Sequence, residues 1–189
     1  NFTWPKWVTP SRDLISTFKQ EGDEVRFKES VVYYDCGWSN YYPSDNYPFM
    51  YKCRSANSSI IKYRYADVLL LKAEALIMQD TPDLEGAADI IDEVRDRAKL
   101  GALSSSTRSN KDALLNALLK ERRLELAFEG QRWFDLVRLD KVEEVMNAVH
   151  AKDSGRKAQV YTYDKNSYRL PIPQSVIDAN DKIHQNPGY

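Results

Sequence analysis

Apolar residues recur every three or four positions through the centre of the chain, which is the spacing of one face of an α-helix. The first such run begins near Ile61. The second follows Thr81, which we expect to be the N-cap, with Pro82 at the first helical position and Gly101 ending the helix. We therefore predict an antiparallel helical hairpin over Ile61 to Leu100. Its faces are Ala66, Leu69, Leu70, Ala73, Leu76 and Ile77, and Leu84, Ala87, Ala88, Ile91, Val94 and Ala98.

Further helical periodicity lies on both sides of this hairpin. Ser11 is expected to cap a short helix from Arg12 to about Lys19, and Asn110 a third helix that continues into the stretch Glu121 to Arg138. Val142 to Val149 is a short amphipathic segment. Alanines at the contact of the hairpin permit close helix approach, in the building style of tetratricopeptide repeats. We predict a mainly α fold with a tetratricopeptide-like helical hairpin and long aromatic-rich loops.

The remaining stretches lack a helical period. Val25 to Tyr34 alternates in part and predicts a short strand or extended arm, while Asp35 to Ser59 is predicted to be irregular. Near the end of the chain, Val160 to Tyr168 predicts a hairpin or extended arm, and Ser175 is expected to cap a final turn. The chain is predicted to be one region with three parts, a loop-rich aromatic segment over residues 1–60, a helical core over 61–150 and an extended tail over 151–189.

The stretch Glu121 to Arg138 mixes charges with large aromatic and aliphatic side chains. Residues three and four apart are neighbours on a helix, so four of the charges would share one stripe. Because burying unpaired charge is costly, we interpret the stripe as a paired, partly buried structural ion network. Gly130 interrupts the run, where we expect a bend or the close approach of another element. The four residues of the stripe are Arg122, Glu125, Glu129 and Arg132.

Catalytic readings of the same residues fit less well. Glycosidases hold two carboxyl groups across a substrate, roughly 5 Å apart or wider, whereas these acids share one stripe beside arginines. A di-metal bundle site uses Glu-x-x-His pairs, and both histidines, His150 and His184, lie elsewhere. The chain also has no Gly-rich phosphate loop and no Gly-x-Ser-x-Gly elbow. We expect a non-catalytic protein with no metal site and no cofactor.

Charge and cysteine content narrow the class further. With 27 basic and 28 acidic residues, the chain gives no reason to expect nucleic acid as a partner. No apolar run approaches the ~20 residues that span a bilayer. The chain starts without a methionine or a signal peptide, so we expect a piece of a longer protein. Cys36 and Cys53 lie in one loop region, and a disulfide and two free thiols are equally compatible with the sequence.

Aromatic residues are abundant outside the predicted helices. Flat rings with polar neighbours suit uncharged amphipathic ligands, of which sugars are the obvious class. The alternative is that these rings pack the loop onto the helical core or onto a part of the protein that this chain does not include. The candidate ligand-binding residues are Trp38, Tyr41 and Tyr42, beside Asn40, Asp45 and Asn46, with Trp4 and Trp7 as a second pair.

Several stretches together resemble the C-terminal region of the SusD/RagB family. The charged helix has the form Glu-Arg-Arg-x-Glu-Leu-x-x-Glu-Gly-x-Arg-Trp-x-Asp-Leu-x-Arg, and three more stretches match in the right order. Small departures at Val176 and Asp181 concern only the last turn. The other matching stretches are Thr9-Pro-Ser-Arg-Asp-Leu-Ile-Ser-Thr-Phe18, Arg64-Tyr-Ala-Asp-Val-Leu-Leu-Leu-Lys-Ala-Glu-Ala-Leu76, and Leu170-Pro-Ile-Pro-Gln-Ser with Gln185-Asn-Pro-Gly-Tyr189.

The resemblance implies a surface-exposed nutrient-binding lipoprotein of the bacterial outer membrane, at least twice as long as this chain and anchored through an N-terminal part. It implies an oligo- or polysaccharide, or another nutrient, as ligand, and a TonB-dependent, SusC-like transporter that the protein caps. Sugar contacts in the family come from variable loops, so no ligand residue transfers to this sequence. The competing interpretation is a helical-repeat scaffold that binds only protein.

Overall fold

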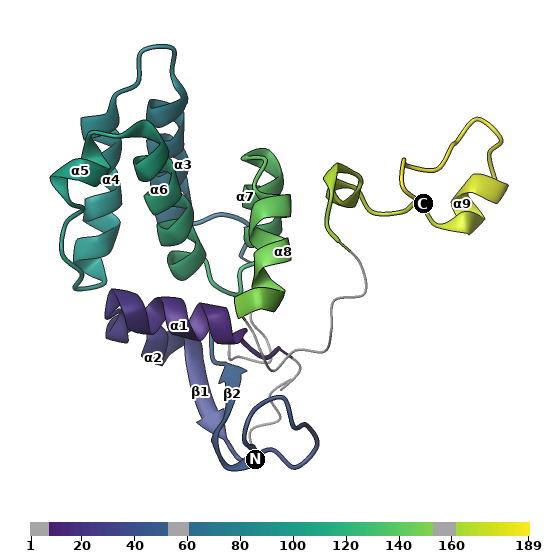
Figure 1. The fold of residues 1–189 in the computed structure, drawn as a ribbon, viewed down its shortest axis with the longest axis horizontal. Coiled ribbons are helices and arrows are strands. Elements are labelled where there is room, and N and C mark those ends of the chain that lie inside the picture. Colours follow the sequence, from purple (N-terminus) through teal and green to yellow (C-terminus); the bar gives the residue numbers. More distant parts are fainter. Residues whose placement is uncertain (1–7, 53–60, 153–161) are drawn as a thin grey trace. The chain divides into compact units, whose positions relative to one another are not determined.

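The computed structural model describes residues 8–52, 61–152 and 162–189, with the side chains of residues 150–152 left out (Figure 1). Trp4, Trp7 and Cys53 therefore lie outside the described residues, as does the side chain of His150. The chain divides into two compact units, Asn1–Arg132 and Trp133–Tyr189. Each unit is built from its own local contacts.

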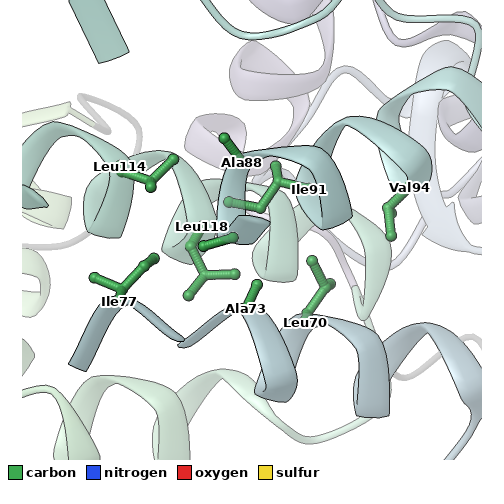
Figure 2. Close-up of a cluster of buried hydrophobic side chains, with 9 residues drawn as sticks. Leu70, Ala73, Ile77, Ala88, Ile91, Val94, Leu114 and Leu118 are labelled. Atoms are coloured by element: carbon green, nitrogen blue, oxygen red, sulfur yellow. The ribbon is translucent and has the colours of Figure 1, made fainter. Parts of the chain in front are cut away.

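The core of the first unit is a helical hairpin with a third helix against it. Helices α3 (Tyr65–Met78) and α4 (Leu84–Arg97) lie side by side, and α6 (Lys111–Glu125) packs on both (Figure 1). Small alanine side chains let the helices approach closely, while leucines and isoleucines fill the space between them (Figure 2). The predicted mainly helical fold is confirmed. The buried cluster is Leu70, Ala73, Ile77, Ala87, Ala88, Ile91, Val94, Leu114 and Leu118.

Capping side chains set where these helices begin. The Asn110 side chain accepts a hydrogen bond from the Ala113 amide at 2.9 Å, so the predicted cap of α6 is confirmed. The prediction of a Thr81 cap is wrong. Asp83 caps α4 instead, because its carboxylate accepts the Gly86 amide at 2.9 Å. The same helix ends at Arg97, before Gly101, and the serine-rich linker that follows contains a short helix, α5 (Ser105–Arg108).

The N-terminal part of this unit contains two helices and a two-stranded ribbon. Helix α1 (Arg12–Glu21) is capped by Ser11 as predicted and ends at Gly22, where φ is 68°. The expected strand from Val25 is wrong in its first half, because Asp23 accepts the Arg26 amide and starts helix α2 (Glu24–Ser30). Strand β1 (Val31–Tyr34) follows α2 and pairs antiparallel with β2 (Tyr47–Met50). Strand β2 lies within the stretch that was predicted to be irregular, and the short 3-10 turn η1 (Ser44–Asn46) precedes it.

Helix α6 ends at Glu125, so the prediction that Arg122, Glu125, Glu129 and Arg132 share one helical stripe is wrong beyond Glu125. The chain turns between residues 126 and 130, where Phe128 has φ 67° and Gly130 φ 80°. Both are left-handed conformations, which end a helix and are costly for residues other than glycine. The interruption expected at Gly130 is present, and it lies in the turn that separates α6 from the next helix, which begins at Arg132.

The second unit contains shorter elements. Helices α7 (Arg132–Arg138) and α8 (Val142–Lys152) are followed by a 3-10 turn, η2 (Lys165–Tyr168), and by α9 (Gln174–Asp178). The described part of the expected hairpin over residues 160–168 is this turn, which Asp164 and Ser167 close with a reciprocal capping box. Helix α9 starts after Pro173, so Ser175 is not its cap. None of the described helices combines the length and the apolar character that crossing a bilayer requires.

Candidate functional site

The loop between β1 and β2 holds a tryptophan at the surface on a base of buried rings. The Trp38 side chain is 63% exposed, while Tyr47 and Phe49 of β2 are 2% and 0% exposed. The Trp38 ring centroid lies 5.9 Å from that of Tyr47 and 6.2 Å from that of Phe49. These tilted contacts hold the indole in position and leave most of its surface to solvent. A held but accessible ring is what ligand stacking requires.

Two tyrosines on the same loop are fixed by an arginine from α1. The Arg12 guanidinium carbon lies 4.1 Å from the Tyr41 ring centroid and 4.6 Å from that of Tyr42, within cation–π range. Arg12 also donates a hydrogen bond to the Tyr41 carbonyl, and the Tyr42 hydroxyl donates to the Pro10 carbonyl at 3.0 Å. The two tyrosine rings meet edge to face at 4.9 Å. Helix α1 thereby positions both rings.

Together these residues surround an open hollow of about 800 Å³, within the size range of small-molecule sites. Ser39 also lines the hollow, and its hydroxyl forms a 2.9 Å hydrogen bond with the hydroxyl of Tyr47. Trp38, Tyr41 and Tyr42 are thus brought together, whereas Asp45 and Asn46 lie in η1, outside the lining. Cys36 is buried and unbridged among the described residues. The lining, which we name the loop hollow, is Arg12, Cys36, Gly37, Trp38, Ser39, Asn40, Tyr41, Tyr42, Pro43 and Ser44.

The charged residues near the end of α6 form a different kind of cluster. Glu125 accepts hydrogen bonds from Arg64 at 2.6 Å and from Arg26 at 3.0 Å, and it also pairs with Arg97. Glu129 accepts from Arg64 at 2.8 Å and pairs with Lys52 at 2.5 Å. The cations that the structure places against the two glutamates come from α2 (Arg26), from α4 (Arg97), and from Lys52 after β2 and Arg64 before α3.

The two predicted arginines of the network have other contacts of their own. Arg122 is 1% exposed and lies 2.9 Å from a carboxylate oxygen of Asp67. Arg132 donates a hydrogen bond to the Leu119 carbonyl at 3.2 Å. The sequence reading missed Arg26 and Arg64, which reach Glu125 across 99 and 61 residues of chain. A helical period carries no signal over such separations.

Electrostatics within the cluster follow from burial and pairing. Burial alone would raise the pKa of Glu125 and Glu129, but hydrogen bonds from Arg64, helped by Arg26 and Lys52, hold both pKa values below the ordinary range. For Glu121, burial raises the pKa by more than the ion pairs with Arg26 and Arg95 lower it, so the pKa lies above the ordinary value. The described residues include no group of three or more metal-ligating side chains placed to hold an ion. These carboxylates form ion pairs with arginine and lysine side chains of the protein, as in a structural ion network.

The family model, the curated relatives and the solved structures that resemble this chain all belong to one family. The model of the SusD family matches residues 45–189. A curated relative named SusD-like protein P38, from Formosa agariphila, is 41% identical over 139 residues, which are 70% of this chain and 25% of that protein. The chain therefore spans about a quarter of the length of this relative.

Solved structures agree on the fold. A SusD superfamily protein from Bacteroides vulgatus superposes with a TM-score of 0.69 at 23% identity, covering 96% of this chain and 44% of that one. A structure described as a laminarin binding SusD-like protein superposes with a TM-score of 0.58 at 26% identity, covering 99% of this chain and 42% of that one. The matched portion is thus less than half of each solved chain.

Proposed function

Since this chain belongs to the SusD family, we propose that it is part of a non-catalytic glycan-binding protein that serves nutrient uptake at a bacterial outer membrane. The observation that carries the proposal is the loop hollow, where an exposed indole and two fixed tyrosines lie beside Asn40 and Ser39. Rings supply flat apolar faces for a sugar, and amide and hydroxyl groups supply hydrogen bonds to its rim.

The rings and the neutral amide and hydroxyl groups of the hollow suit an uncharged ligand. Its arginine, Arg12, is engaged with the Tyr41 and Tyr42 rings and with the Tyr41 carbonyl. The name of one structural neighbour, a laminarin binding SusD-like protein, supports the same ligand class. We therefore infer a neutral oligo- or polysaccharide as the ligand.

The proposals for the partner and the location of the complete protein rest on family membership alone. We propose that the complete protein is anchored by lipid at the cell surface, through a part that this chain does not include, and works with a SusC-like, TonB-dependent transporter. Co-purification of the complete protein with a transporter from detergent-solubilised outer membranes tests this part. Recovery of the protein without any outer-membrane partner, in the presence and absence of glycan, would contradict it.

The binding proposal is tested by affinity electrophoresis and calorimetry of the complete protein. Gels contain laminarin, starch, xylan or pectin, and calorimetry uses hexasaccharides of the retarding glycan. We expect retardation by at least one neutral glycan, and retention of that binding in 1 M salt because no ion pair carries it. Retardation only by the acidic pectin, lost in salt, would contradict a neutral ligand.

A protein-binding scaffold is the second candidate, and one observation favours it. Helix α3 is rich in apolar residues, and the side chains of Tyr65, Val68 and Met78 on it are exposed. Exposed large apolar side chains, when they form a patch, mark protein-binding surfaces. Absence of binding to any glycan, together with a stable protein partner lost on Val68→Asp substitution, would select this candidate over the first.

A further inference from the structure

The second unit has a hollow of its own, of about 690 Å³. Trp133 of α7 and Tyr163 form one wall, with ring centroids 6.3 Å apart. Leu170 and Tyr189 form apolar edges, and the Leu170 side chain is 78% exposed. Aromatic rings and an exposed leucine around a concave space form an apolar surface, and covering that surface with a ligand is favourable. We name this space the tail hollow.

Local hydrogen bonds fix the walls of the tail hollow. The Asn147 side chain holds the Tyr163 backbone from both sides, accepting its amide and donating to its carbonyl at 2.9 Å each. The Tyr189 hydroxyl donates to the Arg169 carbonyl at 3.2 Å. Gly188 has φ 95°, and a Cβ there would lie 2.7 Å from Asn166 Cβ, so only glycine lets the chain end approach this closely. A site held in this way needs little reordering on binding.

Polar groups gather at one side of the tail hollow. Thr162, Asp164, Asn166 and Ser167 all line it. Asp164 accepts the backbone amides of Asn166 and Ser167 at 2.9 and 3.2 Å, and its other carboxylate oxygen accepts the Asn166 side-chain amide at 3.2 Å. Its carboxylate is therefore held in a fixed direction. A carboxylate accepts hydrogen bonds from hydroxyls and repels anions. Among the residues that the structure describes, none of the lining side chains is cationic, which selects against phosphate or carboxylate ligands.

We propose that the tail hollow is a second sugar site, which stacks a neutral pyranose ring on Trp133 and Tyr163 and holds its hydroxyls with Asp164 and Asn166. The inference rests on the proposed glycan-binding function and adds a site on a separate unit, built from residues that the sequence reading did not select. Two sites on one protein raise the avidity for a long glycan when one chain can reach both.

Fluorine NMR of the complete protein labelled with 5-fluorotryptophan tests the two sites at once. Trp→Phe variants assign the signals of the four tryptophans in this chain. Laminarihexaose, cellohexaose, maltohexaose and xylohexaose are the probes. We expect a saturable shift of the Trp133 signal with one of them, with a Kd that differs from the Kd reported by Trp38. Leu170→Ala and Asn166→Ala should each raise the Kd at Trp133 at least about fivefold. Phe134→Ala is the matched control, because Phe134 is 65% exposed and adjacent but does not line the hollow.

The outcomes separate this inference from the proposed function. A Trp38 response without a Trp133 response to any probe overturns the tail site and leaves the loop hollow standing. A Trp133 response alone supports the tail site and contradicts the assignment of the loop. No response at either ring overturns both. A Trp133 shift that Phe134→Ala weakens as much as Leu170→Ala does would report a general change of the unit and would also overturn the tail site.

Discussion

The charged cluster at the end of α6 and the loop hollow are both unusual in composition, yet they differ in what their side chains contact. In the cluster, Glu125 and Glu129 meet cations from several segments. In the loop hollow, Trp38 contacts other rings through one part of its surface and is otherwise exposed. Groups whose bonding capacity is used by the protein hold the structure together. Groups that are held in place but remain accessible are available to a ligand.

The energetic consequences differ in the same way. Removing one partner of a buried ion pair leaves a charge without compensation, which is costly for folding. Removing an exposed ring costs folding little and removes binding surface. Substitutions in the cluster should therefore change stability, and substitutions in the loop hollow should change affinity.

Arg122→Ala should have the largest effect on stability. Arg122 is 1% exposed and pairs with Asp67, which is 3% exposed, so the variant leaves a buried carboxylate without its cation. We expect the free energy of unfolding to fall by about 3–5 kcal/mol, measured by urea denaturation with circular dichroism. Lys28→Ala removes an exposed ion pair with Glu24 and should change stability by less than about 0.5 kcal/mol. Equal effects of the two variants would refute a buried network.

Local patterns predicted the fold far better than they predicted these partners. The hairpin of α3 and α4 and the Asn110 cap follow from spacings of three and four residues, which the sequence displays directly. Arg26 and Arg64 meet Glu125 across long separations, and Arg12 meets Tyr41 across 29 residues. Only the folded chain brings such residues together. The end of α6 at Glu125 could not be predicted, because the turn that follows depends on Phe128 in a left-handed conformation. Phenylalanine rarely adopts this conformation, so its presence in the sequence does not predict such a turn.

Trp38→Ala should lower glycan affinity with little effect on folding. The variant removes the exposed indole over Tyr47 and Phe49, while the ring base beneath stays buried. We expect the Kd for the retarding glycan to rise about tenfold or more, which corresponds to roughly 1.4 kcal/mol, by calorimetry of the complete protein. Trp4→Ala and Trp7→Ala test the second predicted pair. Unchanged affinity in all three variants would show that glycan recognition lies elsewhere.

Acid should weaken the first unit through Glu129. Its pKa is held below the ordinary value of 4.5 by Arg64 and Lys52, against the effect of burial. This contribution to stability is present above the pKa of the unfolded chain and is lost as the pH falls through the lower folded value. Glu129→Gln should therefore flatten the decline of the unfolding free energy below about pH 4.5, measured by urea titrations between pH 7 and 3.

Glu121→Gln provides a control of opposite sign for that titration. Burial raises the pKa of Glu121 in the folded state, so its protonation favours the folded protein as the pH falls from the raised value to the unfolded one. Removing Glu121 should make the acid decline steeper, where removing Glu129 makes it shallower. The same direction of change in both variants would contradict the assigned pairing.

Arg12→Ala should have the smallest effect and links the two sides of the comparison. Arg12 is a charged residue that contacts the Tyr41 and Tyr42 rings and the Tyr41 carbonyl, so it helps to hold the loop hollow. Loss of the cation–π contacts should cost about 0.5–1 kcal/mol of stability and loosen both rings, raising the glycan Kd about threefold. Arg12→Lys keeps the charge without the planar guanidinium and should recover only part of the affinity. If both variants bind as the parent does, Tyr41 and Tyr42 do not contact the glycan, and recognition in the loop hollow depends on Trp38 without them.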